Sequence, residues 1–428
     1  MAILSPLSKI LEKTFCDQVY SYFEQDKLFH PSLHGYRGGR STLTALLSMY
    51  NKWVAAADKG QVTGVVLADL SAAFDLVSPD LLLEKLRIYG VEENSLNWIK
   101  SYLTMRYQTV WIDHCYSDFI EHSIGVPQGS NLGPLLFLVF FNDLAVYLDG
   151  HIDCYADDST ISMTDKDIGR IEDQLNSMCD YLSLWMAGNK FKINADKTHL
   201  LLVGTSSKLQ KTRPIKVTMN GVDLQENSEK RETLLGIVIQ NDLKWSPQVE
   251  VLAKKLNKRL VAIEKLKRVL SRRCKKVIVE GLFNGVLGYC LPLFGGCSGY
   301  ELNTLQVLQN TAARVVLNVP PRSNRDYMFD QLNWLTVRQL IAYQTLVIIF
   351  RLRTEQEPEY LAQCVSQDNR LGHILVRHSR LDLYRNSFVY RGSLLWNKLP
   401  VEIREEQNGK KFKETAKDWV CKNIDRFA

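Results

Sequence analysis

The order of apolar and polar residues predicts a mixed α and β first half and a helical second half. Residues 62–70 form a continuous apolar run rich in β-branched side chains, which is typical of a buried strand. Shorter runs predict a short antiparallel pair at residues 108–111 and 119–123, and further strands at residues 191–203 and 233–239. Apolar positions at helical spacing, with Ser-Pro starts at residues 78 and 246, predict helices from 78, over 94–103, 135–144 and 168–185, and from 246.

A tight hairpin is predicted where residues 151–162 alternate around Asp157 and Asp158. This pattern puts two acidic side chains at the tip of the turn. A loop punctuated by Gly and Pro, residues 125–133, leads into an apolar helix. From residue 281 the pattern is mostly helical.

The composition is that of a folded globular protein. The 428 residues are 46% hydrophobic and 23% charged, which excludes the disordered, collagen-like and coiled-coil classes. No apolar run approaches the roughly 20 residues of a membrane helix. The N-terminus reaches Lys9 and Glu12 before a signal-peptide core can form. None of the nine cysteines stands in a C-x-x-C pair, which fits a reducing compartment. The sequence therefore predicts an intracellular protein that is neither secreted nor membrane-anchored.

Charge is distributed unevenly along the chain. Residues 1–250 contain 23 Lys and Arg against 31 Asp and Glu, whereas residues 251–280 contain 11 against 2. An acidic body beside a basic helix is expected where acidic chemistry acts on a polyanion. The alternative is an ordinary Lys-rich helix in solvent.

Three acidic residues are candidates for metal chemistry: Asp69 at the end of the apolar strand, and Asp157 and Asp158 at the predicted hairpin tip. Adjacent carboxylates repel each other, so they persist most easily where a cation neutralises them. With a third carboxylate from a neighbouring strand, such a set can hold two Mg²⁺ ions about 4 Å apart and stabilise a phosphoryl displacement. Taken alone, an Asp-Asp pair is more often a solvated turn.

Six sequence blocks around these acids follow one another in a fixed order, at residues 34–42, 68–75, 125–134, 155–158, 189–198 and 234–237. They resemble the ordered motifs of the reverse transcriptase fingers and palm. Together with residues 7–13, they most resemble non-LTR (LINE-type) retrotransposons of the jockey-like group. The resemblance is strong over about residues 3–245. It continues more weakly to the end, where residues 309–314 and 391–400 resemble segments downstream of the polymerase.

The resemblance implies an α+β fold of the right-hand polymerase type, with an antiparallel palm sheet and a mainly helical C-terminal region. The implied domains are residues 1–245 (fingers and palm, with N-terminally truncated fingers), 246–300 (basic helical thumb) and 301–428 (C-terminal region). In the thumb, the residues expected to contact template and primer phosphates are Lys254, Lys255, Lys258 and Arg259. Affinity for nucleic acid would then fall steeply with salt.

The implied activity is that of an RNA-directed DNA polymerase, which extends a DNA 3′ end on an RNA template. Asp69 and Asp157 would be the main ligands of two Mg²⁺ ions, with Asp158 as a supporting carboxylate and Mn²⁺ as an alternative ion. Lys197 would protonate the departing pyrophosphate as a general acid. The alternative is that the block around Lys197 serves mainly for packing.

Phe74 lies five residues after Asp69, where the family has a bulky ring beneath the incoming sugar. A ring there would clash with a ribose 2′-OH and favour deoxynucleotides. RNA-dependent RNA polymerases resemble this plan but typically carry an Asp at that point, which accepts a hydrogen bond from the hydroxyl. Phe74 therefore discriminates between the two polymerase classes, unless it is a plain core aromatic.

Four further residues are expected at the substrate. Gln128 and Gly129 would line the nascent base pair. Arg37 and Arg40 are candidates for holding the triphosphate, with surface ion pairing as the alternative. Asp75 is expected to cap the following helix rather than to bind metal.

Parts of a complete element have no counterpart in the sequence. Neither an endonuclease domain nor a ribonuclease H acid set is evident, so a fragment, a decayed copy or a co-opted nucleic-acid-binding relic is the alternative to an active enzyme. The implied partners are an RNA template, a DNA primer or nicked target DNA, dNTPs, and the element's own endonuclease and RNA-binding protein. The implied location is the nucleus, with the cytoplasm as the alternative.

Overall fold

The computed structural model describes residues 4–425 except 71–72, 195–196, 268 and 370–371, and it does not describe the side chain of Asp69. By packing, the chain divides into two compact units. Unit 1 comprises residues 1–41, 63–202 and 212–227, and unit 2 comprises residues 42–62, 203–211 and 228–428. The units interleave along the chain, whereas the three predicted domains are contiguous. The boundaries at residues 245 and 300 stay a prediction.

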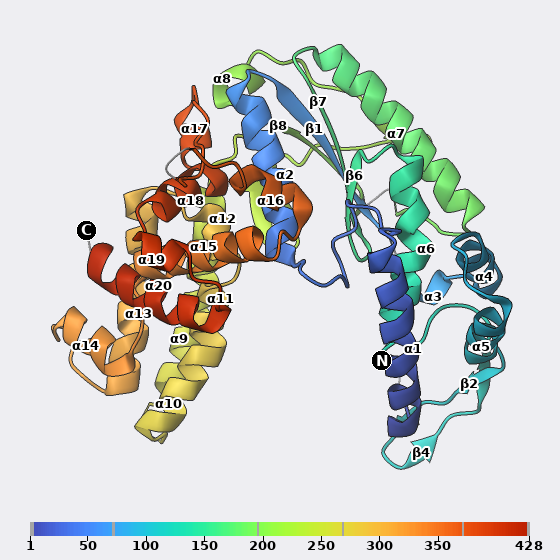
Figure 1. The fold of residues 1–428 in the computed structure, drawn as a ribbon, viewed down its shortest axis with the longest axis horizontal. Coiled ribbons are helices and arrows are strands. Elements are labelled where there is room, and N and C mark those ends of the chain that lie inside the picture. The colour runs from blue at the N-terminus through green and yellow to red at the C-terminus, as the bar shows by residue number, and fades with distance from the viewer. Residues whose placement is uncertain (1–3, 71–72, 195–196, 268, 370–371, 426–428) are drawn as a thin grey trace. The chain divides into compact units, whose positions relative to one another are not determined.

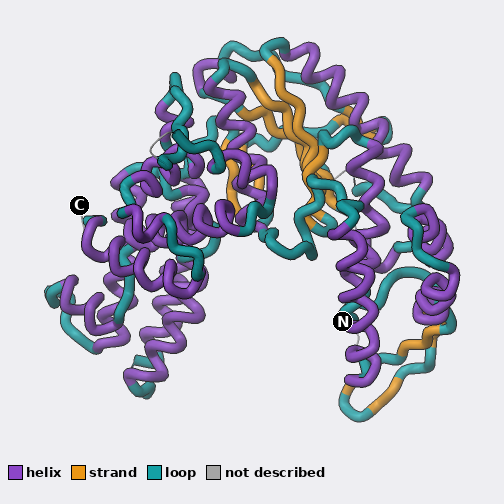
Figure 2. The backbone as a smooth tube through the Cα atoms, in the orientation of Figure 1, coloured by secondary structure: helices purple, strands orange, loops and turns teal. Residues whose placement is uncertain are grey.

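Unit 1 is built around a four-stranded sheet (Figures 1 and 2). In spatial order its strands are β6 (Ile152–Tyr155), β7 (Asp158–Asp165), β1 (Val62–Asp69) and β8 (His199–Val203). β6 and β7 pair antiparallel with Tyr155 opposite Asp158, which confirms the predicted hairpin and its acidic tip. Of the strand predicted over residues 191–203, the structure forms β8 from His199, residues 191–194 are not part of a strand, and residues 195–196 lie outside the described residues.

Strand β1 runs antiparallel to its neighbour β7. The hydroxyl oxygens of Thr63 and Thr164 lie 2.9 Å apart, near the start of β1 and the end of β7. β1 begins at Val62 and β7 ends at Asp165, so this contact joins the start of one strand to the end of the other. Neighbouring strands that meet in this way run in opposite directions. The end of β1 at Asp69 therefore lies beside the start of β7 at Asp158.

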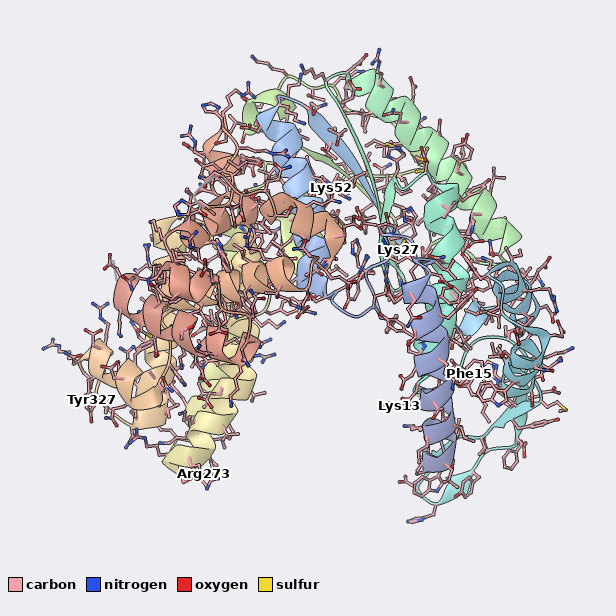
Figure 3. The ribbon with its side chains drawn as sticks, in the orientation of Figure 1. Lys13, Phe15, Lys27, Lys52, Arg273 and Tyr327 are labelled. Carbon is pink, nitrogen blue, oxygen red and sulfur yellow. The ribbon has the colours of Figure 1, made fainter. Side chains whose placement is uncertain are left out.

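Six helices of the described chain complete unit 1: α1 (Pro6–Gln25), α3 (Ala73–Leu76), α4 (Pro79–Ile88), α5 (Glu93–Leu103), α6 (Gly133–Tyr147) and α7 (Ile168–Gly188). Helix α6 is apolar on nearly all sides and mostly buried, as a helix inside a core should be. Helix α1 is not among the predicted helices, because its exposed Leu7, Ile10 and Leu11 break the amphipathic pattern. Phe15, labelled in Figure 3, lies on α1. The Phe15 ring stacks on Trp98 of α5 with ring centroids 4.3 Å apart.

Short strand pairs extend from this unit. β2 (Arg106–Gln108) pairs antiparallel with β5 (Ile120–His122), which confirms the pair predicted in this region. Between β2 and β5 in the sequence, β3 (Trp111–Ile112) pairs with β4 (Cys115–Tyr116). Further along the chain, β9 (Thr218–Met219) pairs with β10 (Val222–Asp223). The sequence pattern did not predict these two pairs, which have only two residues in each strand.

Unit 2 is mainly helical (Figure 2), as predicted for the C-terminal half. Strands β11 (Arg231–Leu234) and β12 (Ile237–Gln240) form a hairpin. Leu235 and Gly236, with φ of 48° and 79°, make its turn, so the single strand predicted over 233–239 is wrong. The helices are α2 (Thr42–Asp58), α8 (Ser206–Leu209), α9 (Ser246–Lys265), α10 (Arg272–Val279), a π-helical turn (Glu280–Asn284), α11 (Gly285–Leu287), α12 (Leu291–Phe294), α13 (Gly299–Leu317), α14 (Arg325–Leu332), α15 (Val337–Thr354), α16 (Glu359–Val365), α17 (Asp382–Arg385), α18 (Phe388–Asn397), α19 (Val401–Arg404) and α20 (Gly409–Asn423).

Local sequence signals account for the main helices of unit 2. The predicted apolar stripe of α9 is buried, at Leu252, Leu256, Leu260 and Ile263. Helix α13 begins with a capping box formed by Ser298 and Glu301, and α15 begins with one formed by Thr336 and Gln339. No single described helix is long and apolar enough to cross a bilayer, although α14 and α15, bent by 41°, meet that test as a pair.

We predict that Gly64→Val destabilises unit 1 by about 1–3 kcal/mol, measured by urea unfolding. A Cβ atom at Gly64 in β1 would lie 2.6 Å from Leu175 Cδ1 and 2.7 Å from Ile171 Cγ2, so the new side chain would push α7 off the sheet. Gly188→Ala at the end of α7 is the control, because its Cβ would meet nothing within 4 Å. An unchanged unfolding midpoint for Gly64→Val would contradict this close packing.

Candidate active site

The β6–β7 turn presents two acidic side chains to solvent. Ala156 adopts a φ of 56°, in the left-handed region, which lets two residues close the hairpin. Asp157 lies in this turn and Asp158 begins β7, and both are exposed. The backbone of Asp69 lies at the neighbouring end of β1, and its side chain lies outside the described part of the structure.

Carboxylate oxygens at this end of the sheet suit a hard divalent ion. Among the side chains that are described, no group of three or more His, Cys, Asp and Glu could hold a metal ion. Because the predicted set depends on Asp69, the three-carboxylate site stays a prediction. Its two described members, Asp157 and Asp158, fit it by being adjacent and open to solvent.

A segment from the first sequence block lies along the outer side of β6. The backbone N–H of His34 donates to the carbonyl of Cys154 over 2.8 Å, next to an isolated parallel bridge between Leu33 and Cys154. A Cβ on Gly35 would lie 2.6 Å from the backbone nitrogen of Ala156, so only glycine allows this approach. The segment is thereby held directly against the acidic hairpin.

Two side chains of this segment reach the hairpin. His34 Nε2 lies 3.0 Å from Asp153 Oδ1, and both residues are buried, at 1% and 8% exposure. Tyr36 is half-exposed with a φ of 57°. Burial raises the pKa of its hydroxyl, and the negative charge of Asp157 raises it further. Sequence reasoning missed Tyr36 as a site residue, although its place between His34 and Arg37 was an available signal.

Phe74 is held rigidly beside this tyrosine. Its ring stacks on Phe137 of α6, with centroids 4.1 Å apart and planes 9° apart. The edge of Tyr36 meets Phe74 at a centroid distance of 5.9 Å. The predicted sugar-contacting ring therefore belongs to an aromatic cluster that fixes its position, and it is only half-buried.

The Gly/Pro-rich loop closes over the segment that carries Phe74. The N–H of Val126 donates to the carbonyl of Phe74 over 2.9 Å, and the N–H of Gly125 donates to the carbonyl of Val77 over 2.7 Å. Gln128 Nε2 donates to Asp75 Oδ1 over 2.8 Å. Asp75 lies within α3, and its carboxylate accepts the hydrogen bond from Gln128. The N-cap residue of the following helix, α4, is Ser78, so the capping role expected of Asp75 is wrong.

The backbone of this loop requires glycine at two positions. Gly129, predicted at the nascent base pair, has a φ of 101°, which residues with a Cβ rarely adopt. Gly125 has a φ of 79°, and a Cβ there would lie 2.7 Å from the carbonyl oxygen of Asp75. The structure thus brings Gln128 and Gly129 to the same end of the sheet as Phe74.

Arg37 is engaged by the protein itself. Its Nε and Nη2 donate to the two carboxylate oxygens of Glu24 over 2.9 Å and 2.8 Å, and its Nη1 donates to the carbonyl of His30. Its side chain is only 8% exposed. Burial acts to raise the pKa of Glu24, but hydrogen bonds and charge from Arg37 outweigh burial and hold this pKa below its ordinary value. This geometry favours the ion-pairing alternative over triphosphate binding.

Arg40 and Lys197 occupy different settings. Arg40 Nη1 donates to the carbonyls of Pro31 and Leu33 over 2.5 Å and 2.8 Å, so Arg40 also braces the segment beside β6. Lys197 is exposed in a short turn just before β8. The role predicted for each at the triphosphate or pyrophosphate stays a prediction.

The four predicted thumb residues lie on α9 in unit 2. Lys254, Lys255 and Lys258 are exposed, and Arg259 is half-buried. Lys254 pairs with Glu250 one turn earlier, with 2.6 Å between Nζ and Oε1, and Arg259 Nη1 donates to the carbonyl of Leu282. Lys255 and Lys258 thus offer exposed ammonium groups outside the buried stripe.

Comparison with protein families identifies the class. Residues 1–265 match the family described as reverse transcriptase (RNA-dependent DNA polymerase), which is more than half of the chain. The chain therefore belongs to the reverse transcriptase family. Its α+β fold, with antiparallel pairing in the central sheet and a helical C-terminal region, is the fold predicted from the sequence.

Curated relatives are similar over most of the chain. A probable RNA-directed DNA polymerase from transposon BS of Drosophila melanogaster is 26% identical over 82% of this chain and 40% of its own length. The RNA-directed DNA polymerase from the mobile element jockey of the same organism is 25% identical over 74% of this chain and 35% of its own length. The chain thus spans two fifths or less of these relatives.

Solved structures give a weaker likeness. Apo telomerase from Candida tropicalis aligns with 96% of this chain and 59% of its own, at 11% identity and a TM-score of 0.43. At that score the likeness supports no argument about the site.

We predict that the Glu24–Arg37 pair loses its stabilising effect in acid. Because the folded-state pKa of Glu24 is below its ordinary value of 4.5, the contribution is present above pH 4.5 and is lost as the pH falls through the lowered pKa. Urea unfolding of unit 1 between about pH 6 and pH 3 measures it.

In this experiment, Glu24→Gln should flatten the acid limb of stability against pH. Glu84→Gln, at an exposed position on α4, is the control and should keep the wild-type profile. Identical profiles for wild type and Glu24→Gln would show that the ion pair does not form as described.

Proposed function

We propose that this chain is the polymerase portion of an RNA-directed DNA polymerase from a non-LTR retrotransposon. It would extend a DNA 3′ end on an RNA template. The observation that carries the proposal is the joining of four predicted motifs by three contacts at one end of the unit 1 sheet: Gly35 against Ala156, Tyr36 against Phe74, and Val126 on Phe74. Membership in the reverse transcriptase family supports the same conclusion.

The acidic hairpin would supply the metal ligands. Reverse transcriptases generally use divalent ions, and two Mg²⁺ ions, or Mn²⁺ instead, would activate the 3′ hydroxyl and neutralise charge on the phosphates. Asp157 and Asp158 would offer carboxylate oxygens from the turn, and Asp69 would complete the set from β1. Lys197 would hold the proton for the leaving pyrophosphate.

The aromatic cluster would select the sugar. Stacking on Phe137 prevents the Phe74 ring from moving aside when a 2′-OH approaches, so a ribose would meet a fixed steric barrier. Gln128, oriented by Asp75, and Gly129 would contact the nascent base pair. This arrangement favours deoxynucleotides, and therefore a reverse transcriptase over an RNA-dependent RNA polymerase.

The proposed partners are nucleic acids and further proteins of the same element. Lys254, Lys255, Lys258 and Arg259 would contact the sugar-phosphate backbones of template and primer without reading sequence. Nicked target DNA would serve as primer, the nucleus would be the site of action, and the element's endonuclease and RNA-binding protein would be further partners. The names of the relatives from transposons BS and jockey support an origin in a mobile element.

We expect Asp157→Asn to reduce primer extension on poly(rA)/oligo(dT) with Mg²⁺ and dTTP by about a thousandfold, since metal stabilisation of the transition state amounts to several kcal/mol. Asp149→Asn is the matched control, because Asp149 is exposed with a φ of 50°, which Asn tolerates equally well. Incorporation that survives unchanged in Asp157→Asn would show that Asp157 does not hold a catalytic metal ion, and a wild-type chain without activity would favour a relic that only binds nucleic acid.

We expect Phe74→Ala to lower the preference for dTTP over UTP by at least about tenfold in the same assay, because the barrier to the 2′-OH is removed. Phe74→Val, which keeps part of the packing against Phe137, tests the same point if the alanine variant unfolds. Phe119→Ala is the control, since Phe119 is 72% exposed near β5. A preference that stays at the wild-type level would show that Phe74 does not contact the sugar.

A further inference from the structure

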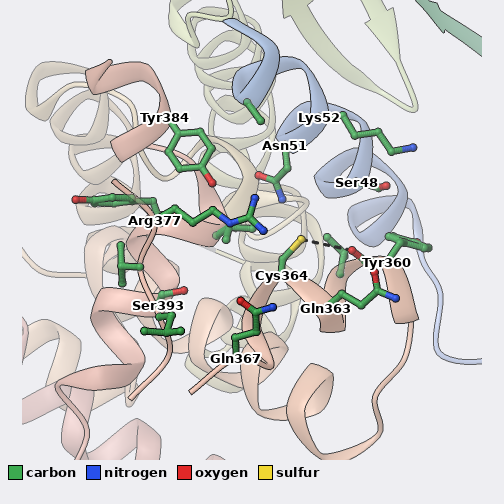
Figure 4. A pocket seen from close by; sticks show the side chains of 16 residues that line it. Ser48, Asn51, Lys52, Tyr360, Gln363, Cys364, Gln367, Arg377, Tyr384 and Ser393 are labelled. Carbon is green, nitrogen blue, oxygen red and sulfur yellow. Dashed lines mark hydrogen bonds between the residues drawn. The ribbon is translucent and has the colours of Figure 1, made fainter. Parts of the chain in front are cut away.

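Unit 2 contains a cavity that the proposed polymerase chemistry does not use. It has a volume of about 310 Å³, at the lower end of the roughly 300–1,000 Å³ typical of small-molecule pockets. Its walls come from α2, α16, α17, α18 and the extended segment at residues 375–377 (Figure 4). This volume suits one nucleotide rather than a folded peptide.

Asn51 is the most unusual residue of this cavity. It projects from α2 toward Cys364 and Arg377 (Figure 4). Both atoms of its amide, Nδ2 and Oδ1, are shielded from solvent, and neither has a hydrogen-bond partner. A buried donor and acceptor left unpaired cost free energy, so native proteins rarely keep them without a compensating role. A ligand with a neighbouring acceptor and donor would satisfy both atoms.

The other walls offer aromatic faces and positive charge. Tyr384 and Tyr390 line one side, with their rings edge to face at a centroid distance of 6.2 Å. Arg377 is exposed at the same side, and Lys52 lies at the rim on α2 (Figure 4). None of the described residues that line the cavity is acidic. The lining thus combines an amide, aromatic rings and cations without a competing anion.

These features match the chemistry of a nucleotide. The edge of a nucleobase presents adjacent donors and acceptors, which an Asn amide can pair with in a bidentate manner. Unpaired bases stack on aromatic side chains and guanidinium planes, and the phosphate is an acceptor for Arg. We propose that this cavity binds one unpaired nucleotide of an RNA strand, with its base edge on Asn51 and its phosphate on Arg377.

A nucleotide with this chemistry is either part of an RNA strand or free in solution. The choice of RNA rests on the proposed function, which makes RNA the template. In that setting the cavity would hold template RNA on unit 2 at a point where a base is unpaired, and it would add base preference to the sequence-independent contacts of α9.

The test is photo-crosslinking of eight-nucleotide single-stranded RNAs, each with one 4-thiouridine, to the full chain, followed by peptide mapping. We expect a crosslink within residues 359–393 that is reduced about tenfold by Asn51→Leu and several-fold by Arg377→Ala. Arg322→Ala, at an exposed position outside the cavity, removes the same charge and should leave the crosslink unchanged. Crosslinks that are unaffected by both cavity variants would overturn the proposal.

Two further measurements separate the alternatives. Asn51→Leu removes two unpaired buried groups, so its melting temperature should equal or exceed that of wild type. If Asn51→Leu melts at a lower temperature than wild type, the crosslink yield of Arg377→Ala decides whether the cavity binds RNA. Unlabelled octamer should compete for the crosslink far better than free UMP. Equal competition by UMP would assign the cavity to a free nucleotide and overturn the choice of RNA.

The outcome is distinguishable from a failure of the polymerase proposal. Asp157→Asn should reduce extension about a thousandfold and keep the crosslink in residues 359–393, because the hairpin belongs to unit 1 and the cavity to unit 2. A wild-type chain that crosslinks in an Asn51-dependent manner but does not extend a primer would support the cavity alone. A chain that extends a primer without this crosslink would overturn the cavity alone.

Discussion

The register of the β6–β7 hairpin is the constraint on which the site depends. Antiparallel pairing puts Tyr155 opposite Asp158, so that Ala156 and Asp157 must form the turn. Because side chains alternate between the two faces of a strand, a slip by one residue would move every side chain of β7 to the opposite face. The left-handed backbone of Ala156 and the close approach of Gly35 both require this register. The position of the acids is therefore a consequence of backbone pairing.

Backbone contacts also explain how distant sequence blocks reach one end of the sheet. The loop at residues 125–129 bonds the main chain of residues 74–77, and the segment around His34 bonds the main chain of β6. Main-chain hydrogen bonds tolerate many side chains, which suits a site whose chemistry depends on a few fixed residues. Side chains such as His34, Asp153, Arg37 and Glu24 then hold these segments in place.

The cavity of unit 2 presents polar groups in a different manner from the His34–Asp153 pair of unit 1. In unit 1, the buried polar atoms of His34 and Asp153 contact each other, and the arginine of the first block contacts a carboxylate. In the cavity of unit 2, both polar atoms of the Asn51 amide are buried without a partner. An unsatisfied group inside a well-packed helical unit is a local cost that a ligand can remove. The Asn51 amide thus differs from the His34–Asp153 pair in having polar atoms that a ligand could satisfy.

The sequence alone determined the family, the strand β1, the acidic hairpin and the amphipathic helices, because periodicity and turn residues are local properties of the chain. It also pointed to Phe74, Gln128 and Gly129, which the fold brings together. It erred at residues 233–239, where a turn at Leu235 and Gly236 interrupts an apolar run. Only the tertiary structure decided that Arg37 pairs with Glu24, that Tyr36 meets Phe74, and that the Asn51 amide has no partner. Each of these depends on which side chains meet across the fold, and no local pattern specifies that.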